Sequence, residues 1–346
     1  MTLVLLLAGF ALASAAVWFA GIRLSNATDV LSMRLGLGEA VGGAILLAFA
    51  TNLPEIAIVV TAAIGHNLGI ATGNILGGIA IQTVVLAVLD RFGSRDTPLT
   101  YRAASLQLVV EGALVVALLA IVVDGTRLAP GGISFRVLFP TILIFIVWVV
   151  GLWLVGRAQR GLPWHEQGNP PDGQKHPRGH RKTMMERQGP STRRAVVTFT
   201  AAAAVTLGGG VALEMLSNSI STRIGLSGVL FGATVLAAAT SLPEVSTGLQ
   251  SLKLGDYQLA VSDIFGGNAF LPVLLLPATL ISGSAVLPQA HASDVYLTAL
   301  GILLTIVYMA GLMFRPKRQW ARLGPDSIAV VALYLLGIVG LTFVTQ

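Results

Sequence analysis

Long apolar stretches restrict the possible folds of this chain more than any other feature. Of its 346 residues, 54% are hydrophobic and only 11% are charged, which is too few polar side chains to cover a water-soluble protein of this size. A helix that crosses a membrane needs roughly 20 mainly apolar residues. The sequence therefore predicts an all-α integral membrane protein with ten transmembrane helices, at residues 2–22, 38–65, 67–89, 103–123, 135–157, 194–216, 226–252, 254–282, 293–314 and 326–345.

Basic residues gather in alternate loops between these spans. The loops after the first, third, fifth, seventh and ninth spans hold 19 of the 22 Lys and Arg residues, and the opposite loops hold only Arg127, Arg136 and Arg223. Cytoplasmic loops of membrane proteins are enriched in Lys and Arg. We therefore expect a multi-pass protein of the cell inner (plasma) membrane with both termini outside the cytoplasm. The net charge of +6 reflects this topology, and no nucleic-acid partner is expected.

One long polar segment separates the fifth span from the sixth. Residues 158–193 are rich in proline, glycine and basic side chains, a composition typical of a flexible linker. We expect this segment to be cytoplasmic, where its basic side chains can contact anionic membrane lipid. It divides the chain into a first five-helix unit, residues 1–157, and a second, residues 194–346.

The two five-helix units are related in sequence. A shift of 189 residues aligns residues 34–82 with residues 223–271 without a gap, and 17 of these 49 positions are identical. Because each unit has an odd number of spans, the second unit enters the membrane from the opposite face, and the repeat is inverted. Inverted repeats are typical of alternating-access transporters, whose binding site lies near the membrane midplane where the halves meet.

A proline followed by a glutamate occupies the same position in each repeat. Pro54 and Pro243 lie near the middle of the second and seventh spans, where proline removes a backbone hydrogen bond and interrupts the helix. An acidic side chain at this depth costs on the order of 2.5 to 3.5 kcal/mol. The adjacent Glu55 and Glu244 would repel each other near the midplane unless a cation lay between them or a proton neutralised one. This pattern predicts a divalent-cation site that protons can contest.

Other oxygen donors recur at matched positions around the two glutamates. Calcium prefers six to eight oxygen ligands, and such donors suit calcium or sodium better than zinc or copper. The glycine pairs at 77–78 and 266–267 indicate either helix breaks or close packing. Glu111, in the fourth span, faces either a crevice or a buried hydrogen-bond partner. The candidate cation ligands are Glu55, Glu244, Thr51, Thr240, Asn52, Ser241, Asn74, Asp263, Gln82 and Asn268.

The motifs TNLPE with GNILGG, and TSLPE with SDIFGG, resemble the two alpha-repeats of the sodium/calcium exchanger membrane region in the calcium/cation antiporter superfamily. The resemblance implies a 5+5 inverted-repeat fold in which broken helices 2, 3, 7 and 8 form the site, while helices 1 and 6 slide to expose it alternately. By position, Glu55 and Glu244 match the family's calcium-binding glutamates, and Thr51 and Thr240 match neighbouring ligands.

Several positions depart from that family pattern. Asn52 replaces the usual serine, and Asp263 replaces the usual asparagine. Gly78 and Gly267 stand where the family commonly has a small hydroxyl residue, and Gln82 and Leu271 stand where it has a polar amide or carboxylate. These later positions resemble sodium-site ligands, so both sodium and protons stay open as the coupling ion.

The sequence thus predicts a secondary active antiporter that exchanges calcium, or a similar divalent cation, for sodium or protons by alternating access. One alternative is a degenerate exchanger fold that binds an ion or a partner without coupled transport, and a weaker one is a channel. The chain has no P-loop, catalytic triad or redox motif, so we expect neither enzymatic activity nor a cofactor. The expected partners are inorganic cations and membrane lipid, and the oligomeric state stays open.

Overall fold

The computed structural model describes residues 2–34, 49–93, 96–128, 134–158, 191–226, 228–253 and 255–344. The first part of the second predicted span and nearly all of the predicted linker lie outside these described residues. An isolated bridge between Trp320 and Leu323 is the only β-type pairing in the described part of the chain. All other regular elements there are helical.

The helices follow the order of the predicted spans. Nine of the described segments are long and apolar enough to cross a membrane, and α3 is a shorter apolar helix. This arrangement confirms the all-α membrane fold. The main elements are α1 (Leu3–Arg34), α3 (Leu53–Ile64), α4 (Leu68–Gly93), α5 (Leu99–Ala103), α6 (Leu106–Gly125), α7 (Phe135–Ala158), α9 (Thr192–Ile224), α10 (Gly228–Phe231), η2 (Gly232–Leu236), α11 (Ala237–Thr240), α12 (Leu242–Lys253), α13 (Tyr257–Phe270), η3 (Leu271–Leu274), α14 (Leu275–Ser282), η4 (Leu287–Gln289), α15 (Ala292–Phe314) and α16 (Pro325–Val344).

Two helices are longer than predicted. α1 continues to Arg34 instead of ending near residue 22, and α9 continues to Ile224 instead of residue 216. In their polar extensions, hydroxyl side chains find hydrogen-bond partners within the helix itself. Thr28 donates to the Leu24 carbonyl at 2.9 Å, and Thr222 donates to the Asn218 carbonyl at 2.7 Å. Such polar residues lower the hydropathy of a segment without interrupting its helix.

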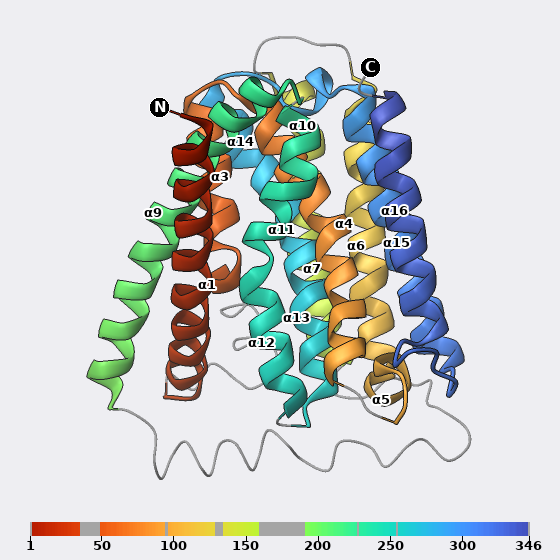
Figure 1. Cartoon of the computed structure of the whole chain (residues 1–346). Helices are drawn as coiled ribbons and strands as arrows, with labels where there is room; N and C mark the ends of the chain where they lie inside the picture. Colours follow the sequence, from red (N-terminus) through yellow and green to blue (C-terminus); the bar gives the residue numbers. More distant parts are fainter. Residues whose placement is uncertain are drawn as a thin grey trace.

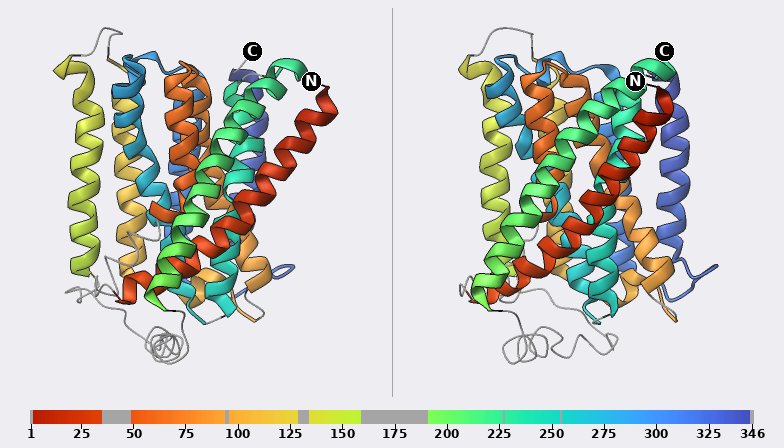
Figure 2. Two further views of the ribbon diagram at one scale, coloured as in Figure 1. Left: turned by 90° about the vertical axis from the view of Figure 1, so that its left-hand side faces the viewer. Right: turned by 60° about the vertical axis from the view of Figure 1, so that its left-hand side comes forward.

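The first helices of the two halves run in opposite directions. α1 descends from the end of the bundle that carries both termini, and its counterpart α9 ascends toward that end (Figure 1). The two helices pack against each other along a large part of their length. Together they lie tilted across one side of the remaining, more upright helices (Figure 2). This antiparallel relation is the inversion that the sequence repeat predicts.

The seventh and eighth predicted spans are interrupted as expected, and the second is interrupted at Asn52. α3 begins at Leu53 after Asn52, whose φ and ψ are −88° and 12°. Ser241 takes a similar conformation between α11 and α12, with φ and ψ of −79° and 0°. In the eighth span, α13 passes through its glycine pair and changes to the 3-10 helix η3 at Leu271. The break there coincides with Pro272.

The expected break in the third helix is wrong, because α4 is one continuous helix from Leu68 to Gly93. This segment contains no proline, so every residue can donate its backbone N–H. Its glycines serve close packing instead. A side chain on Gly77 would place its Cβ 3.0 Å from the carbonyl carbon of Ala233 and in direct overlap with other Ala233 atoms. Gly77 therefore allows α4 of the first half to touch η2 of the second.

Candidate ion-binding site

The ten candidate ligands are all buried. None of them is more than 7% exposed, and the two glutamates are 1% and 2% exposed. Burying so many polar atoms in an apolar helical bundle is costly unless they bind one another or a ligand. Each of these side chains therefore needs a polar partner or a bound ion.

The two glutamates lie at matched helix starts. Glu55 is in the first turn of α3, and Glu244 is in the first turn of α12. α3 rises from the middle of the bundle and α12 descends from it (Figure 1). The positive ends of two helix dipoles therefore point toward the middle, where they favour negative charge. Pro54 and Pro243 have no N–H to donate to the preceding turn, which explains why both helices start there.

Four of the candidate ligands form one electrostatic cluster. Glu244 interacts electrostatically with Glu55 and with Asp263. The Thr240 hydroxyl lies beside Glu55, although its own hydrogen bond goes to the Ala237 carbonyl at 3.2 Å. Asp263 accepts a hydrogen bond of 2.8 Å from Thr247. The cluster thus joins acidic groups from α3, α12 and α13.

Nothing basic neutralises this cluster in the described part of the chain. The carboxylate oxygens of Glu55 and Glu244 have no hydrogen-bond partner among the described residues. The one ion pair formed by those residues joins Arg102 to Asp96 at 3.8 Å. Buried carboxylates that face each other require a cation or a shared proton. A cation fits this donor set, since carboxylate, hydroxyl and amide oxygens are the ligands of hard cations.

Two amide side chains lie around Gly267 on α13. A Cβ on Gly267 would lie 3.1 Å from Asn52 Nδ2 and 3.4 Å from Gln82 Oε1. Both amides therefore occupy the space where a larger residue at position 267 would place its side chain. The side chain of the neighbouring Asn268 instead donates a hydrogen bond to Thr83 Oγ1 at 3.1 Å.

The remaining candidates are placed less directly at the carboxylates. Ser241 donates its hydroxyl hydrogen to the Ala237 carbonyl at 2.7 Å. Thr51 is buried at the end of the turn that precedes α3. Asn74 lies beside Gly232 of η2, and neither polar atom of its side chain has a hydrogen-bond partner among the described residues. The structure thus brings Glu55, Thr240, Glu244 and Asp263 together, and the amides of Asn52 and Gln82 meet at Gly267, one turn after Asp263 on α13.

The described residues contain no group of three His, Cys, Asp or Glu side chains at the spacing of a metal site. Amides, hydroxyls and backbone carbonyls would have to complete the coordination of a cation at the central cluster. Such a mixed oxygen set fits calcium or sodium and disfavours zinc and copper, which prefer imidazole and thiolate.

Several buried acidic residues were not singled out in the sequence. They are Asp90, Glu214, Asp256, Asp294 and Asp326, each no more than 6% exposed. In the sequence, each of them lies within or at the end of an apolar run. None has an acidic counterpart at the equivalent position of the other repeat. Of the two alternatives for Glu111, a crevice or a buried hydrogen bond, the structure shows the hydrogen bond. Its Oε1 accepts from Gln107 Nε2 at 2.7 Å.

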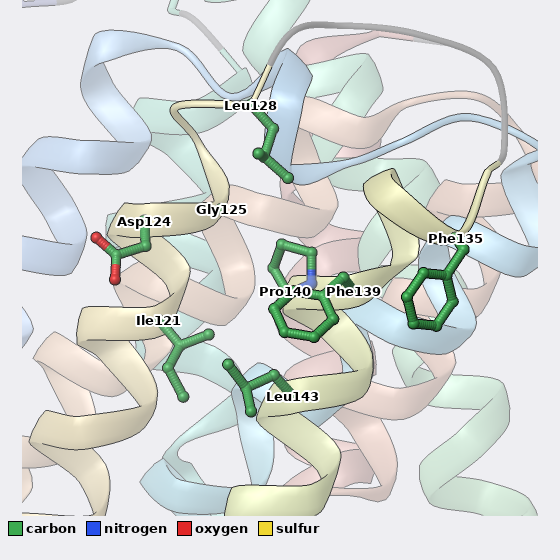
Figure 3. A pocket seen from close by; sticks show the side chains of 8 residues that line it. All are labelled: Ile121, Asp124, Gly125, Leu128, Phe135, Phe139, Pro140 and Leu143. Carbon is green, nitrogen blue, oxygen red and sulfur yellow. The ribbon is translucent and has the colours of Figure 1, made fainter.

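A separate cavity of about 480 Å³ lies between α6 and α7. Figure 3 shows apolar side chains around it, while the carboxylate of Asp124 points away from Phe139 and Leu143. None of the candidate ligands lines this cavity, so it is distinct from the central cluster. Its lining residues are Ile121, Asp124, Gly125, Leu128, Phe135, Phe139, Pro140 and Leu143.

Two helical halves of opposite orientation, with broken helices that bring carboxylates to the middle of the bundle, define an inverted-repeat membrane protein with an acidic central site. The sequence model of the sodium/calcium exchanger protein family matches residues 5–154 and 194–343. The chain therefore belongs to the sodium/calcium exchanger protein family. This membership confirms the resemblance of the two alpha-repeat motifs.

Relatives and solved structures agree with this family. Inner membrane protein YrbG of Escherichia coli K12 is 26% identical over 286 residues, and the putative antiporter CaxA of Alkalimonas amylolytica is 24% identical over 285 residues; each match covers 80% of both chains. The H+/Ca2+ exchanger CAX shares the fold with a TM-score of 0.69 and 15% identity, over 97% of this chain and 82% of that chain. The sodium-calcium exchanger NCX_Mj has a TM-score of 0.62 and 17% identity, over 98% and 99%.

Proposed function

We propose that this protein is a secondary active antiporter that exchanges calcium, or a similar divalent cation, for sodium or protons by alternating access. The observation that carries the proposal is the electrostatic interaction between two buried carboxylates, Glu55 and Glu244, on symmetry-related helix starts. Their combined charge matches a divalent cation. The same charge can be balanced by protons or sodium ions on the return step, and this shared site is what couples the two fluxes.

Each candidate ligand has a proposed role. Glu55 and Glu244 bind the divalent cation directly, and Thr51 and Thr240 supply neighbouring oxygens. Asp263, held by Thr247 at 2.8 Å, adds a third negative charge at the edge of the cluster. Asn52, Asn74, Gln82, Asn268 and Ser241 line the surroundings and contribute amide or hydroxyl oxygens when the coordination shell closes.

The coupling ion is either sodium or the proton. The structural neighbours include an H+/Ca2+ exchanger and a sodium-calcium exchanger. In this chain, the amides of Asn52 and Gln82 approach the position of Gly267, where the family pattern has a hydroxyl. Proton coupling needs only the carboxylates, whereas sodium coupling needs these amide oxygens to replace the missing hydroxyls.

Alternating access is proposed to depend on how α1 and α9 pack over the two breaks. A Cβ on Gly21 of α1 would lie 2.7 Å from Pro243 Cβ, and a Cβ on Gly210 of α9 would lie 2.7 Å from the Pro54 carbonyl oxygen. Gly21 and Gly210 are 189 residues apart, as are the two prolines. α1 and α9 therefore each pack a glycine, with no protruding side chain, against the proline of an interrupted helix. We propose that this contact lets α1 and α9 slide past the breaks.

Calcium uptake into proteoliposomes tests this proposal. Vesicles loaded with sodium are compared with vesicles that carry a proton gradient, for the wild type, for Glu55→Gln and for Glu111→Gln. We expect one gradient to drive uptake, Glu55→Gln to reduce it at least a hundredfold, and Glu111→Gln to retain most of it, because Glu111 is bonded to Gln107 on α6.

The outcomes separate the candidate functions. Uptake driven by sodium alone or by protons alone identifies the coupling ion. Calcium flux down its own gradient without counter-ion exchange would indicate a channel. Binding of calcium without flux under either gradient would favour a protein that binds an ion without transporting it.

A further inference from the structure

A second group of buried acidic side chains lies at the end of the bundle opposite the two termini, where α4, α5, α15 and α16 meet (Figure 1). Asp90 is in the last turns of α4 and is 0% exposed; Asp326 is in the first turn of α16 and is 6% exposed. Neither residue belongs to the central cluster, which lies at the middle of the bundle.

Asp90 connects segments from both halves of the chain. Its Oδ1 accepts a hydrogen bond from the Leu99 backbone at 2.7 Å, and its Oδ2 accepts from the Gly324 backbone and from Ser327 Oγ, each at 2.7 Å. A carboxylate offers about four acceptor directions. Asp90 therefore has its position fixed by three bonds and keeps capacity for one further ligand.

Asp326 faces Asp90 within a cradle of two glycines. A Cβ on Gly324 would touch Asp326 Oδ1 and would lie 3.3 Å from Asp90 Oδ2. On the neighbouring α15, a Cβ on Gly311 would lie 2.9 Å from Asp326 Cγ. Both carboxylates thus reach the space beside Gly324, and a side chain at position 324 would fill it, whereas a side chain at position 311 would displace Asp326 itself.

Three oxygens beside Asp90 make no hydrogen bond of ordinary geometry with the described residues, namely both carboxylate oxygens of Asp326 and the hydroxyl of Thr100. Thr100 is 1% exposed. Its hydroxyl and the backbone N–H groups of Asp326 and Ser327 lie close enough to the Asp326 carboxylate to stabilise its charge. Two basic side chains at this end of the bundle, Arg315 and Lys317, lie over the ring of Tyr101 at 5.3 and 5.6 Å.

We propose that Asp90, Thr100 and Asp326 form a second cation site, separate from the central cluster, that takes a divalent cation of the calcium type. Two facing carboxylates supply two negative charges, and the hydroxyl completes an all-oxygen donor set of the kind that calcium prefers. The ligands come from α4 and α5 of the first half and from α16 of the second. An ion bound there holds the two halves together at the end of the bundle that carries most of the basic residues.

Calcium binding to the full-length chain tests this second site independently of transport. The Glu55→Gln/Glu244→Gln double variant removes the central carboxylates, and equilibrium binding of radioactive calcium is measured in detergent. We expect one bound equivalent to remain in this background. Adding Asp326→Asn or Thr100→Val should weaken that binding at least tenfold, while Asp96→Asn, which alters an exposed carboxylate at the same end, should leave it unchanged.

Two variants keep the test decisive. Thr100→Val preserves the shape of the side chain, so it still reports on the site if Asp326→Asn fails to fold by gel filtration. The proposal is overturned if the double variant binds no calcium, or if the remaining binding is insensitive to both substitutions. An infrared band of a protonated carboxylic acid that Asp326→Asn removes, together with no residual calcium binding, would identify a shared proton instead. Equal stoichiometry in the wild type and the double variant would contradict the central site and leave this one standing.

Discussion

At the scale of single residues, the proposed function depends on carboxylates whose surroundings are asymmetric although the repeat is symmetric. Glu55 and Glu244 are equivalents, but the position equivalent to Asp263 is Asn74. Only the second half therefore adds a third carboxylate, and Thr247 donates to it at 2.8 Å. This bond orients the Asp263 carboxylate, which can then face a cation.

Substitution of Thr247 by valine should weaken divalent-cation binding about tenfold. Loss of a hydrogen bond to a charged group costs about 1.5 kcal/mol or more, and an Asp263 carboxylate that Thr247 no longer orients is less well placed to bind the cation. The dissociation constant of calcium in detergent measures the effect. Thr305→Val is the matched control, because Thr305 is also buried but bonds only within α15, to the Gly301 carbonyl. Equal affinities of both variants would remove Asp263 from the site.

At the scale of helices, glycines determine which elements can approach each other. Gly77 lets α4 pack directly on Ala233. The glycine pair of α4 thus serves packing, and the helix is continuous although a break was expected. Gly21 and Gly210 let α1 and α9 lie against the two prolines that interrupt the second and seventh spans. Small residues at helix interfaces are the usual means of close packing in membranes.

Substitution of Gly210 by valine should therefore reduce transport strongly. Its Cβ would lie 2.7 Å from the Pro54 carbonyl oxygen and 2.8 Å from Ala57 Cβ, and such overpacking costs roughly 1 to 3 kcal/mol. We expect a lower melting temperature in detergent and at least tenfold slower calcium uptake. Gly208→Val is the control, because nothing lies within 4 Å of a Cβ at that position on the same helix. Similar losses in both variants would argue against a specific contact of α9 with the break.

At the scale of the whole molecule, both ends of the described chain lie at one end of the bundle, and α5 lies at the other (Figure 1). The basic loops predicted to be cytoplasmic are at the α5 end. If the positive-inside rule holds here, the termini and the η4 segment face away from the cytoplasm. The chain has no cysteine, so single cysteines report on this orientation without a background.

Labelling of intact cells with a membrane-impermeant maleimide should distinguish the two ends. Gln289→Cys, at the end of η4, should react in cells with a permeabilised outer envelope, whereas Arg318→Cys should react only after the inner membrane is lysed. Both side chains are exposed. The reverse labelling pattern would invert the proposed topology and place both termini in the cytoplasm.

Much of the fold could be predicted from local sequence, because lipid imposes local requirements. Each span must satisfy its own backbone and present apolar side chains, so composition alone locates the helices. Proline acts on the turn that precedes it, which explains why the breaks at Pro54 and Pro243 were found. The repeat then placed Glu55 and Glu244 at equivalent depths, and these expectations required no knowledge of packing.

Tertiary structure decided the features that depend on contacts between distant segments. Whether a glycine pair breaks a helix or packs it depends on the partner, and Gly77 meets Ala233 across the two halves. The approach of Asp326 to Asp90 arises only when α16 returns beside α4. Sequence thus determined where the chain crosses the membrane and that Glu55, Glu244 and Asp263 lie within it, whereas packing determined which other acidic residues are buried and which carboxylates meet.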